Sequence, residues 1–332
     1  MSATAEEIIE RRRLRRKLVF WRCAGVLGFL VAIGVGLLLA LGPDGLSGRS
    51  RPHVARIAIS GFITEDREQL QLIDRLANDD AVRAVIVSID SGGGATVGGE
   101  ALYAALRTLS DRKPTVASIK TLGASAAYMA AIATDHVVAY RSSITGSIGV
   151  LFQSPEVSGA MQKLGIALVE VKSSPLKAAP SPFAAPTQDA LDVVKGMIDS
   201  TYQWFVDIVA ERRKLDRATA LKLADGRVYS GDQAKAVGLV DAIGGEREAE
   251  DWLVKDRHVD ARLPVLDWRK SDASGGFSFS KVASALLLRQ LGLAPDLMDG
   301  SGLAPWMPRL DLDGLLSVWQ APAVLNAKGA AR

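Results

Sequence analysis

Two side chains in this 332-residue sequence have the chemistry to cleave an amide bond together. Ser125 lies where an apolar run gives way to very small residues, in the stretch Gly123-Ala-Ser-Ala-Ala-Tyr128. Lys177 lies in a stretch that has no acidic residue from Ser173 to Thr187, so no carboxylate nearby in sequence would hold its proton. An uncharged lysine can take the proton of a serine hydroxyl and so make the oxygen a nucleophile.

Each of these residues also has an ordinary structural interpretation. Ser125 could cap the N-terminus of a helix, and most lysines in loops are simply solvated. Lys172 and Lys120 are rival bases. A Ser-His-Asp triad is a further alternative because His136 is close to Ser125 in sequence and adjoins Asp135, although its run predicts a buried strand. Of the other two histidines, His53 lies in a predicted linker and His258 lies in a charged segment.

A glycine cluster follows the most apolar of the predicted strands, in Ile89-Asp-Ser-Gly-Gly-Gly94. Consecutive glycines let the backbone approach a ligand with its N–H donors, which suits either a phosphate or an oxyanion. Phosphate is the weaker interpretation because no Gly-Lys-Ser/Thr follows and the glycines lack the G-x-G-x-x-G spacing. A tight strand-to-helix turn is the structural alternative.

Composition excludes several classes of protein. One Cys and three His, without ligand spacing, exclude an intrachain disulfide and predict no metal site, and we expect no cofactor. The net charge of +3 is concentrated at the N-terminus, where residues 1–22 hold seven basic and three acidic residues. The rest of the chain has 33 basic and 34 acidic residues, which argues against nucleic acid as a partner.

The basic arm precedes a predicted membrane anchor. Cys23 to Leu41 is a run of 19 residues without a charge. As a helix it would measure about 29 Å, close to the thickness of a bilayer core. The cations before it predict that residues 1–22 stay in the cytoplasm and that the rest of the chain crosses. A cleaved signal peptide and a buried core helix are the alternatives, but the run is long for the first and lacks amphipathic periodicity for the second.

After a linker at 42–53, strands alternate with helices, which predicts an α/β fold with a largely parallel, covered sheet and crossover helices. Strands are expected at 54–59, 81–89, 114–119, 136–139, 147–152, 166–171 and 263–268. Helices are expected at 67–77, 101–109, 125–133, 246–254 and 282–293, with two more within 187–224. The segment from 294 onward could pack on a neighbour or the membrane surface, or form a loose extension.

Five short motifs together resemble the signal peptide peptidase SppA family in its shorter, single-domain form, over about Val54 to Gly245. They are Asp90-Ser-Gly-Gly-Gly94, Gly123-Ala-Ser-Ala-Ala-Tyr128, Thr145-Gly-Ser-Ile-Gly-Val150, Lys172-Ser-Ser-Pro-Leu-Lys177 and the closing motif Ala224-Asp-Gly-Arg-Val-Tyr-Ser-Gly231, which continues to Asp241. The sequence departs from the family pattern at Gly92, where the family has proline, and at Ala126, Ala127 and Ser174, where it has glycine.

The resemblance implies a ClpP/crotonase-like fold and a membrane-anchored serine protease with a Ser-Lys dyad. Ser125 would be the nucleophile, Lys177 the general base and Ser147 the residue that orients the lysine. We expect the N–H groups of Gly93 and Ala126 to form the oxyanion hole. The resemblance also implies a homo-oligomeric ring or dome.

We therefore expect a peptidase domain at 54–254 and a C-terminal extension at 255–332. It would act outside the bacterial cytoplasmic membrane on apolar peptides, such as signal peptides left in the lipid bilayer. A catalytically inactive membrane scaffold and a crotonase-type acyl-CoA enzyme are the alternatives.

Overall fold

A computed structural model describes residues 49–270 without a break, the backbone of Leu316–Val318, and residues 17, 20–22, 24–30 and 33. The chain divides into two units, 1–51 and 52–332. In the part of the chain that is described, no helix combines the length and the apolar character needed to cross a bilayer. Most of the predicted anchor Cys23–Leu41, and all of the helix predicted at 282–293, lie outside the described residues.

The second unit contains a mostly parallel sheet, as predicted. Its central strands are apolar along most of their length because both faces of the sheet are covered. The main path through the sheet is β6-β5-β3-β2-β1-β8; β4 pairs with β3, β7 with β4, and β9 with β2. The parallel strands are β1 (His53–Ile63), β2 (Val82–Ala95), β3 (Thr115–Ala124), β4 (His136–Ala139), β5 (Ile144–Gly146), β7 (Ala242–Ile243) and β8 (Val265–Asp267). The antiparallel additions are β6 (Val228–Ser230), which pairs with β5, and β9 (Leu316–Val318), which pairs with β2.

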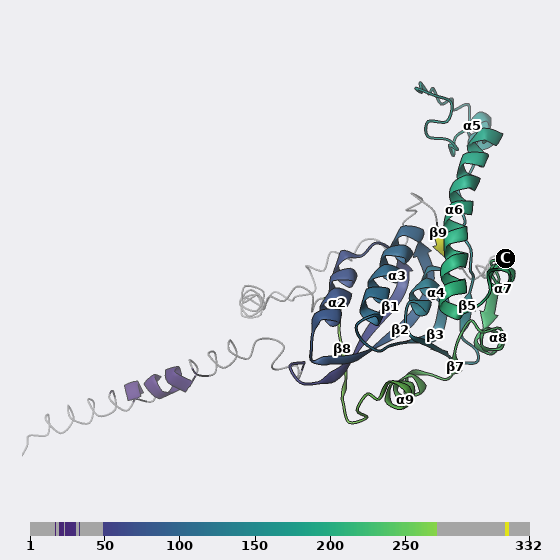
Figure 1. Ribbon diagram of the computed structural model, residues 1–332. Coiled ribbons are helices and arrows are strands. Elements are labelled where there is room, and N and C mark those ends of the chain that lie inside the picture. Colours follow the sequence, from purple (N-terminus) through teal and green to yellow (C-terminus); the bar gives the residue numbers. More distant parts are fainter. Residues whose placement is uncertain are drawn as a thin grey trace, which may run out of the picture. The chain divides into compact units, whose positions relative to one another are not determined.

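Helices cover the two faces unequally, as Figure 1 shows. Alternate residues of β2 point to opposite sides, so that Val85 and Val87 join the larger core while Ala84 and Ile86 join the smaller one. The larger core lies under α2 (Arg67–Asn78), α3 (Thr96–Ser110), α4 (Ala126–Ile132) and the C-terminal half of α6 (Gln188–Arg213). The smaller core lies under α9 (Glu246–Arg257). The remaining helices are α5 (Ser158–Lys163), α7 (Arg217–Leu223) and α8 (Gly231–Ala236).

Three predicted strands differ from the observed ones. β2 continues through the glycine cluster to Ala95 because the glycines pair with Phe62 and Ile63 of β1. The strand expected at 147–152 is wrong, since the residues that pair with β3 are the preceding ones, 144–146. The strand expected at 166–171 is also wrong: the segment pairs with no strand in the described chain, and Val169 and Val171 are 87% and 97% exposed.

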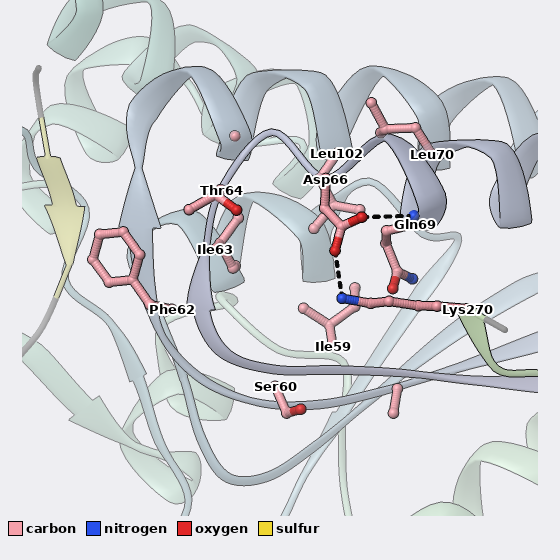
Figure 2. A pocket seen from close by; sticks show the side chains of 12 residues that line it. Ile59, Ser60, Phe62, Ile63, Thr64, Asp66, Gln69, Leu70, Leu102 and Lys270 are labelled. Carbon is pink, nitrogen blue, oxygen red and sulfur yellow. Dashed lines mark hydrogen bonds and ion pairs between the residues drawn. The ribbon is translucent and has the colours of Figure 1, made fainter. Parts of the chain in front are cut away.

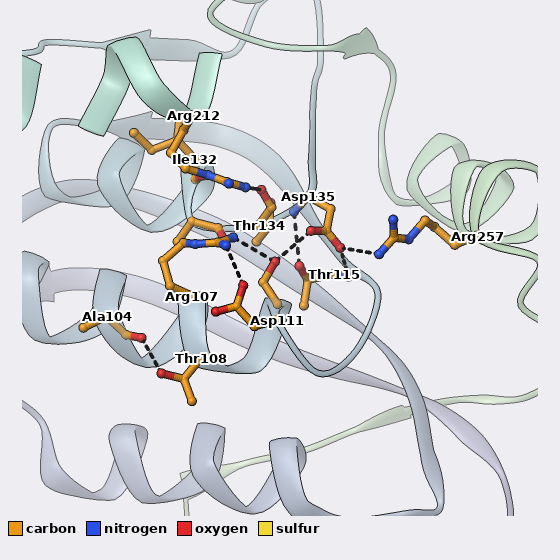
Figure 3. Close-up of polar contacts among 12 residues, drawn as sticks. Ala104, Arg107, Thr108, Asp111, Thr115, Ile132, Thr134, Asp135, Arg212 and Arg257 are labelled. Atoms are coloured by element: carbon orange, nitrogen blue, oxygen red, sulfur yellow. Dashed lines mark hydrogen bonds and ion pairs between the residues drawn. The ribbon is translucent and has the colours of Figure 1, made fainter. Parts of the chain in front are cut away.

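Two arginines cap the C-terminal end of α4 (Figure 3). Arg212 donates to the carbonyl oxygens of Ile132 and Thr134, at 2.9 and 3.0 Å. Arg107 donates to the carbonyl oxygen of Ala133 at 3.0 Å. Carbonyls at a helix end have no partner within the helix, so these guanidinium groups satisfy them and attach α3 and α6 to α4.

A partly buried ionic cluster joins α6 to the strands. Arg213 donates to both oxygens of Asp241, at 2.9 and 2.6 Å, and the same carboxylate accepts from the N–H of Val137 at 2.8 Å. Burial alone would raise the pKa of Asp241, but the hydrogen bonds and charge of Arg213 keep it below its usual range. His136 stacks on Trp252 at 4.6 Å, and burial lowers the pKa of its imidazole.

We predict that Arg212→Ala lowers the free energy of unfolding by about 2 to 4 kcal/mol, because it leaves two buried carbonyl groups without a donor. Arg217→Ala is the matched control, since this arginine is exposed and pairs with Asp207 at the surface. Its loss should cost less than about 1 kcal/mol. Urea unfolding of the full chain in detergent measures both, and equal losses would contradict the capping role.

The lowered pKa of His136 predicts a pH-dependent stability. The imidazole binds a proton more readily in the unfolded chain, so its contribution to stability is complete above about pH 6.5 and is lost as the pH falls through the lower folded pKa. His136→Gln should therefore flatten part of the decline in unfolding free energy between about pH 6.5 and 5. Urea titrations of the wild type and the variant at several pH values measure the difference, and an unchanged decline in the variant would contradict the prediction.

Candidate active site

Ser125 forms the turn between β3, which ends at Ala124, and α4, which begins at Ala126. Its φ and ψ angles are 60° and −122°, outside the regions that residues with a side chain normally occupy. Its N–H donates to the carbonyl oxygen of Gly146 at 2.8 Å, and its side chain makes no capping hydrogen bond to the helix. The structure therefore does not support the helix-cap interpretation of this serine.

Such a backbone costs about 1 to 3 kcal/mol and persists only where the surroundings enforce it. Close packing enforces it here. A Cβ atom on Gly123 would lie 2.8 Å from the Ile119 side chain, and one on Gly99 of α3 would lie 2.9 Å from the Cβ of Ala126. A serine on a strained strand-to-helix turn is also the geometry of the nucleophile elbow in α/β-hydrolases.

Ser147 occupies the equivalent position on the next strand. β3 and β5 are parallel with Ala124 opposite Gly146, so Ser125 and Ser147 are the first residues after two paired strands. Ser147 also has a positive φ, 49°, and its N–H donates to the carbonyl oxygen of Arg227 at 2.8 Å. The register therefore brings these two predicted site residues to the same edge of the sheet.

The closing motif supports Ser147 through its backbone. β6 lies in this motif and pairs with β5, and the ring of Tyr229 packs against Gly146 so closely that an added Cβ would lie 2.6 Å away. The side chain of Arg227 pairs with Asp225 at the surface. Asp225 and Arg227 therefore have a structural role in this turn.

The glycine cluster lies beside this edge as the end of β2. Gly93 has a φ of 104°, and its N–H donates to Ser91 Oγ at 3.1 Å. Ser91 is buried and donates in turn to the carbonyl oxygen of Gly61 at 2.6 Å. Gly94 admits no side chain, because its Cβ would lie 2.0 Å from the carbonyl oxygen of Ile63. Ser91 was not singled out by sequence; its place inside the Asp90–Gly94 motif was the available signal.

Lys177 lies in a different part of the unit. Its side chain is exposed, in a turn where its N–H donates to the carbonyl oxygen of Ser174 at 3.1 Å. This loop is joined to α5 by a hydrogen bond from Val157 to Pro182, and Figure 1 shows α5 at the outer end of α6, away from the sheet. Within residues 49–270, the structure contains no hydrogen bond between Lys177 and Ser125.

The rival bases are engaged elsewhere. Lys172 forms an ion pair with Glu170 at 2.7 Å. Lys120 lines a shallow polar hollow with Tyr140 and Glu246. The histidines make structural contacts instead of a triad: His53 is buried and accepts from Trp268, His136 lies beside Asp241, and His258 ends α9.

A small pocket of about 80 Å³ lies near the site, between the end of β1 and the first turns of α2 and α3. Asp66 accepts hydrogen bonds from Lys270 and from the N–H of Gln69 at its mouth, as Figure 2 shows. Gly98 lines this pocket, whereas the next residue, Gly99, packs on Ala126. The first turn of α3 therefore separates the pocket from Ser125.

Comparison with known proteins places this geometry in a family. The model of peptidase family S49 matches residues 107–260, which include Ser125, Ser147 and Lys177. A candidate signal peptide peptidase SppA of Enterococcus faecium is 31% identical over 244 residues, covering 69% of this chain and 70% of that protein. The chain belongs to peptidase family S49. The family resemblance predicted from the five motifs is thereby confirmed.

Two further proteins are similar to part of this chain. A candidate protease of Methanocaldococcus jannaschii is 40% identical over 183 residues, which is 55% of this chain and 59% of that protein. Among solved structures, a ClpP1 mutant of Listeria monocytogenes aligns with a TM-score of 0.40 and 14% identity, over 58% of this chain and 92% of that one. Membership of family S49 supports a serine-type peptidase.

In this S49 chain, the strained turn predicts that glycine and alanine at position 125 rank in the reverse of their usual order of stability. Ser125→Gly should be more stable than Ser125→Ala by about 1 to 2 kcal/mol, because glycine adopts a positive φ without steric cost. Inside a regular helix or strand the order is the reverse, because glycine there is less stable than alanine by about 0.5 to 1 kcal/mol. Thermal and urea unfolding of both variants measure the difference, and an alanine variant as stable as the glycine variant would show that the turn is unstrained.

Proposed function

We propose that this chain is a serine endopeptidase in which Ser125 attacks a peptide carbonyl and an uncharged Lys177 takes its proton. The observation that carries the proposal is the strained turn at Ser125 in a chain of family S49. A hydroxyl that does not cap its own helix, on a backbone held at an energetic cost, is expected where the residue reacts.

The reaction would be acyl transfer to water. Ser125 Oγ bonds to the carbonyl carbon while its proton moves to Lys177 Nζ, and the ammonium then protonates the leaving amine. The same lysine next takes a proton from water, which hydrolyses the acyl-enzyme. Ser147, beside Ser125 at the sheet edge, would accept a hydrogen bond from the lysine and orient it.

The oxyanion of the tetrahedral intermediate would be held by backbone N–H groups. Ala126 is the first residue of α4, so its N–H has no acceptor within the helix. The N–H of Gly93 is directed to Ser91 Oγ in this structure and would have to turn towards substrate. Glycine permits that change of backbone angles. One such donor typically contributes about 2.7 to 4 kcal/mol to the transition state.

The proposed base requires a second copy of the chain. Lys177 belongs to a projecting arm made of α5, its flanking loops and the outer half of α6 (Figure 1). The arm exposes many large apolar side chains: Leu164, Ile166, Leu168, Val169, Val171, Leu176, Phe183, Leu191, Val193 and Met197. An apolar surface of this kind is typical of an interface. We infer that the arm docks on a neighbouring copy and brings Lys177 to that copy's Ser125, where burial would favour the uncharged amine.

The substrate and location follow from the sequence features near the N-terminus. An uncharged run long enough for a bilayer, preceded by seven cations, supports a single-pass anchor in the bacterial cytoplasmic membrane with the peptidase domain outside the cytoplasm. A site held near the membrane surface would meet apolar peptides, including signal peptides left after precursor processing. The ClpP/crotonase-like architecture and an oligomeric ring are part of the same proposal.

We predict that Ser125→Ala and Lys177→Ala each reduce cleavage of an apolar signal peptide by about 10³-fold or more in detergent-solubilised protein. Lys172→Ala is the matched control, because this nearby lysine is paired with Glu170, and it should retain activity. If sites form between copies, coassembly of the two inactive variants should restore roughly a quarter of the wild-type activity, since one neighbouring pair in four combines an intact serine with an intact lysine.

Several outcomes would count against this proposal. Undiminished cleavage by Lys177→Ala would reject the base, and absence of cleavage by the wild type would favour a membrane scaffold. If both single variants are inactive and the mixed assemblies stay inactive, the dyad would have to form within one chain.

A further inference from the structure

A bulge interrupts β2 at the glycine cluster. The register of β2 against β1 is regular up to Asp90 and resumes at Gly93. Between these two positions, a single residue of β1, Gly61, spans the same stretch as two residues of β2, Ser91 and Gly92. Bulges disrupt the hydrogen-bond ladder locally and are common beside active sites. The backbone groups in this bulge therefore need partners other than the neighbouring strand.

The hydroxyl group of Ser91 supplies such partners on both sides of the bulge. It donates to the carbonyl oxygen of Gly61 at 2.6 Å and accepts a hydrogen bond from the N–H of Gly93 at 3.1 Å. Ser91 is only 2% exposed, and a hydrogen bond is stronger in such a buried place than in water. One buried hydroxyl therefore fixes the direction of the Gly93 N–H, the group that we expect to donate to the oxyanion.

The peptide group between Gly92 and Gly93 has unusual freedom to rotate. Gly93 has a φ of 104°, a region that glycine enters without steric cost. Residue 92 is glycine here, where the family pattern has proline. A proline ring would fix φ at about −65°, so glycine gives the loop a freedom that proline would remove. The orientation of the Gly93 N–H thus depends on its hydrogen bond to Ser91.

We propose that Ser91 is a positioning residue that acts as a latch: its hydroxyl holds the N–H of Gly93 away from the oxyanion hole until the transition state forms. The proposal rests on the proposed peptidase function. As negative charge develops on the substrate's carbonyl oxygen, that oxygen becomes a stronger acceptor than the neutral hydroxyl, and the N–H turns to it. The bond from Ser91 to Gly61 stays in place. Because the N–H has to leave Ser91 first, the latch lowers the rate of acylation.

The first experiment measures cleavage of an apolar signal peptide by the full chain in detergent. Ser91→Ala removes the acceptor, and kcat should rise about fivefold, which corresponds to one neutral hydrogen bond of about 1 kcal/mol. KM should stay near the wild-type value, because the substrate carbonyl is uncharged before it reacts. Ser91→Cys keeps a similar shape with a weaker acceptor, so its kcat should lie between those of the wild type and Ser91→Ala.

Stability separates a latch from a serine with only a structural role. Ser91→Ala also leaves the carbonyl group of Gly61 without this donor, so the variant should unfold at a lower urea concentration than the wild type. A residue with only a structural role would lose activity together with stability, whereas a latch gains activity as stability falls. Ser88→Ala is the matched control, because Ser88 is buried in the same strand ahead of the bulge, and its kcat should stay unchanged.

The second experiment needs no catalysis. Amide hydrogen exchange is followed by NMR in the full chain with its glycines labelled with ¹⁵N. The N–H of Gly93 should exchange about fivefold faster in Ser91→Ala than in the wild type, because its hydrogen-bond acceptor is gone. Gly99, a buried glycine of α3, is the internal reference, since a change in its exchange reports a general loss of stability.

The outcomes separate the latch from the peptidase assignment. If the wild type cleaves the peptide and Ser91→Ala has an equal or lower kcat, the latch is overturned and the peptidase stands. Equal exchange of the Gly93 N–H in the wild type and in Ser91→Ala, relative to Gly99, would also overturn the latch, whatever the activity. If no form cleaves the peptide, the peptidase itself is rejected and the latch with it.

Discussion

The site depends on the parallel pairing of β3 with β5. Ala124 lies opposite Gly146, and the N–H of Ser125 donates to the Gly146 carbonyl. This one register therefore fixes where both strands end and leave the sheet. Each strand then turns through a serine with positive φ. A shift of this pairing by one residue would offset the two serines from each other and turn the side chains of the shifted strand to the opposite face.

The surroundings of the turn explain how a strained conformation can persist. The residues that meet around α4 are glycine and alanine at the N-terminal end, where there is no space for a larger side chain. At the C-terminal end, Arg107 and Arg212 satisfy three carbonyl groups in succession. The short helix is therefore held at both ends, and the strain at Ser125 is offset by packing and hydrogen bonds elsewhere.

Much of this architecture could be predicted from the sequence. The apolar strands and amphipathic helices between 54 and 139 have clear periodicity, and the motifs around Ser125 and Ser147 identified the residues that the register brings together.

What could not be predicted depends on partners far away in the chain. The glycine cluster continues β2 because β1 and β9 pair with it, and Ile166–Val171 is no strand because no neighbour in the described chain pairs with it. Local composition carries no information about such partners. The separation of the Lys177 loop from the sheet could not be predicted for the same reason. Sequence alone does not show how far a helix extends beyond the hydrophobic core of the domain.

That helix, α6, has 26 residues and so measures about 39 Å. Only its inner half is anchored in the core, through Phe205, Val206, Ile208 and Val209. If the helix tilts as a rigid body about Phe205, a tilt of about 5° would move its outer end by about 2 Å, given the rise of an α-helix. Small differences in core volume around Phe205 could in this way adjust the reach of a loop that contacts none of those residues.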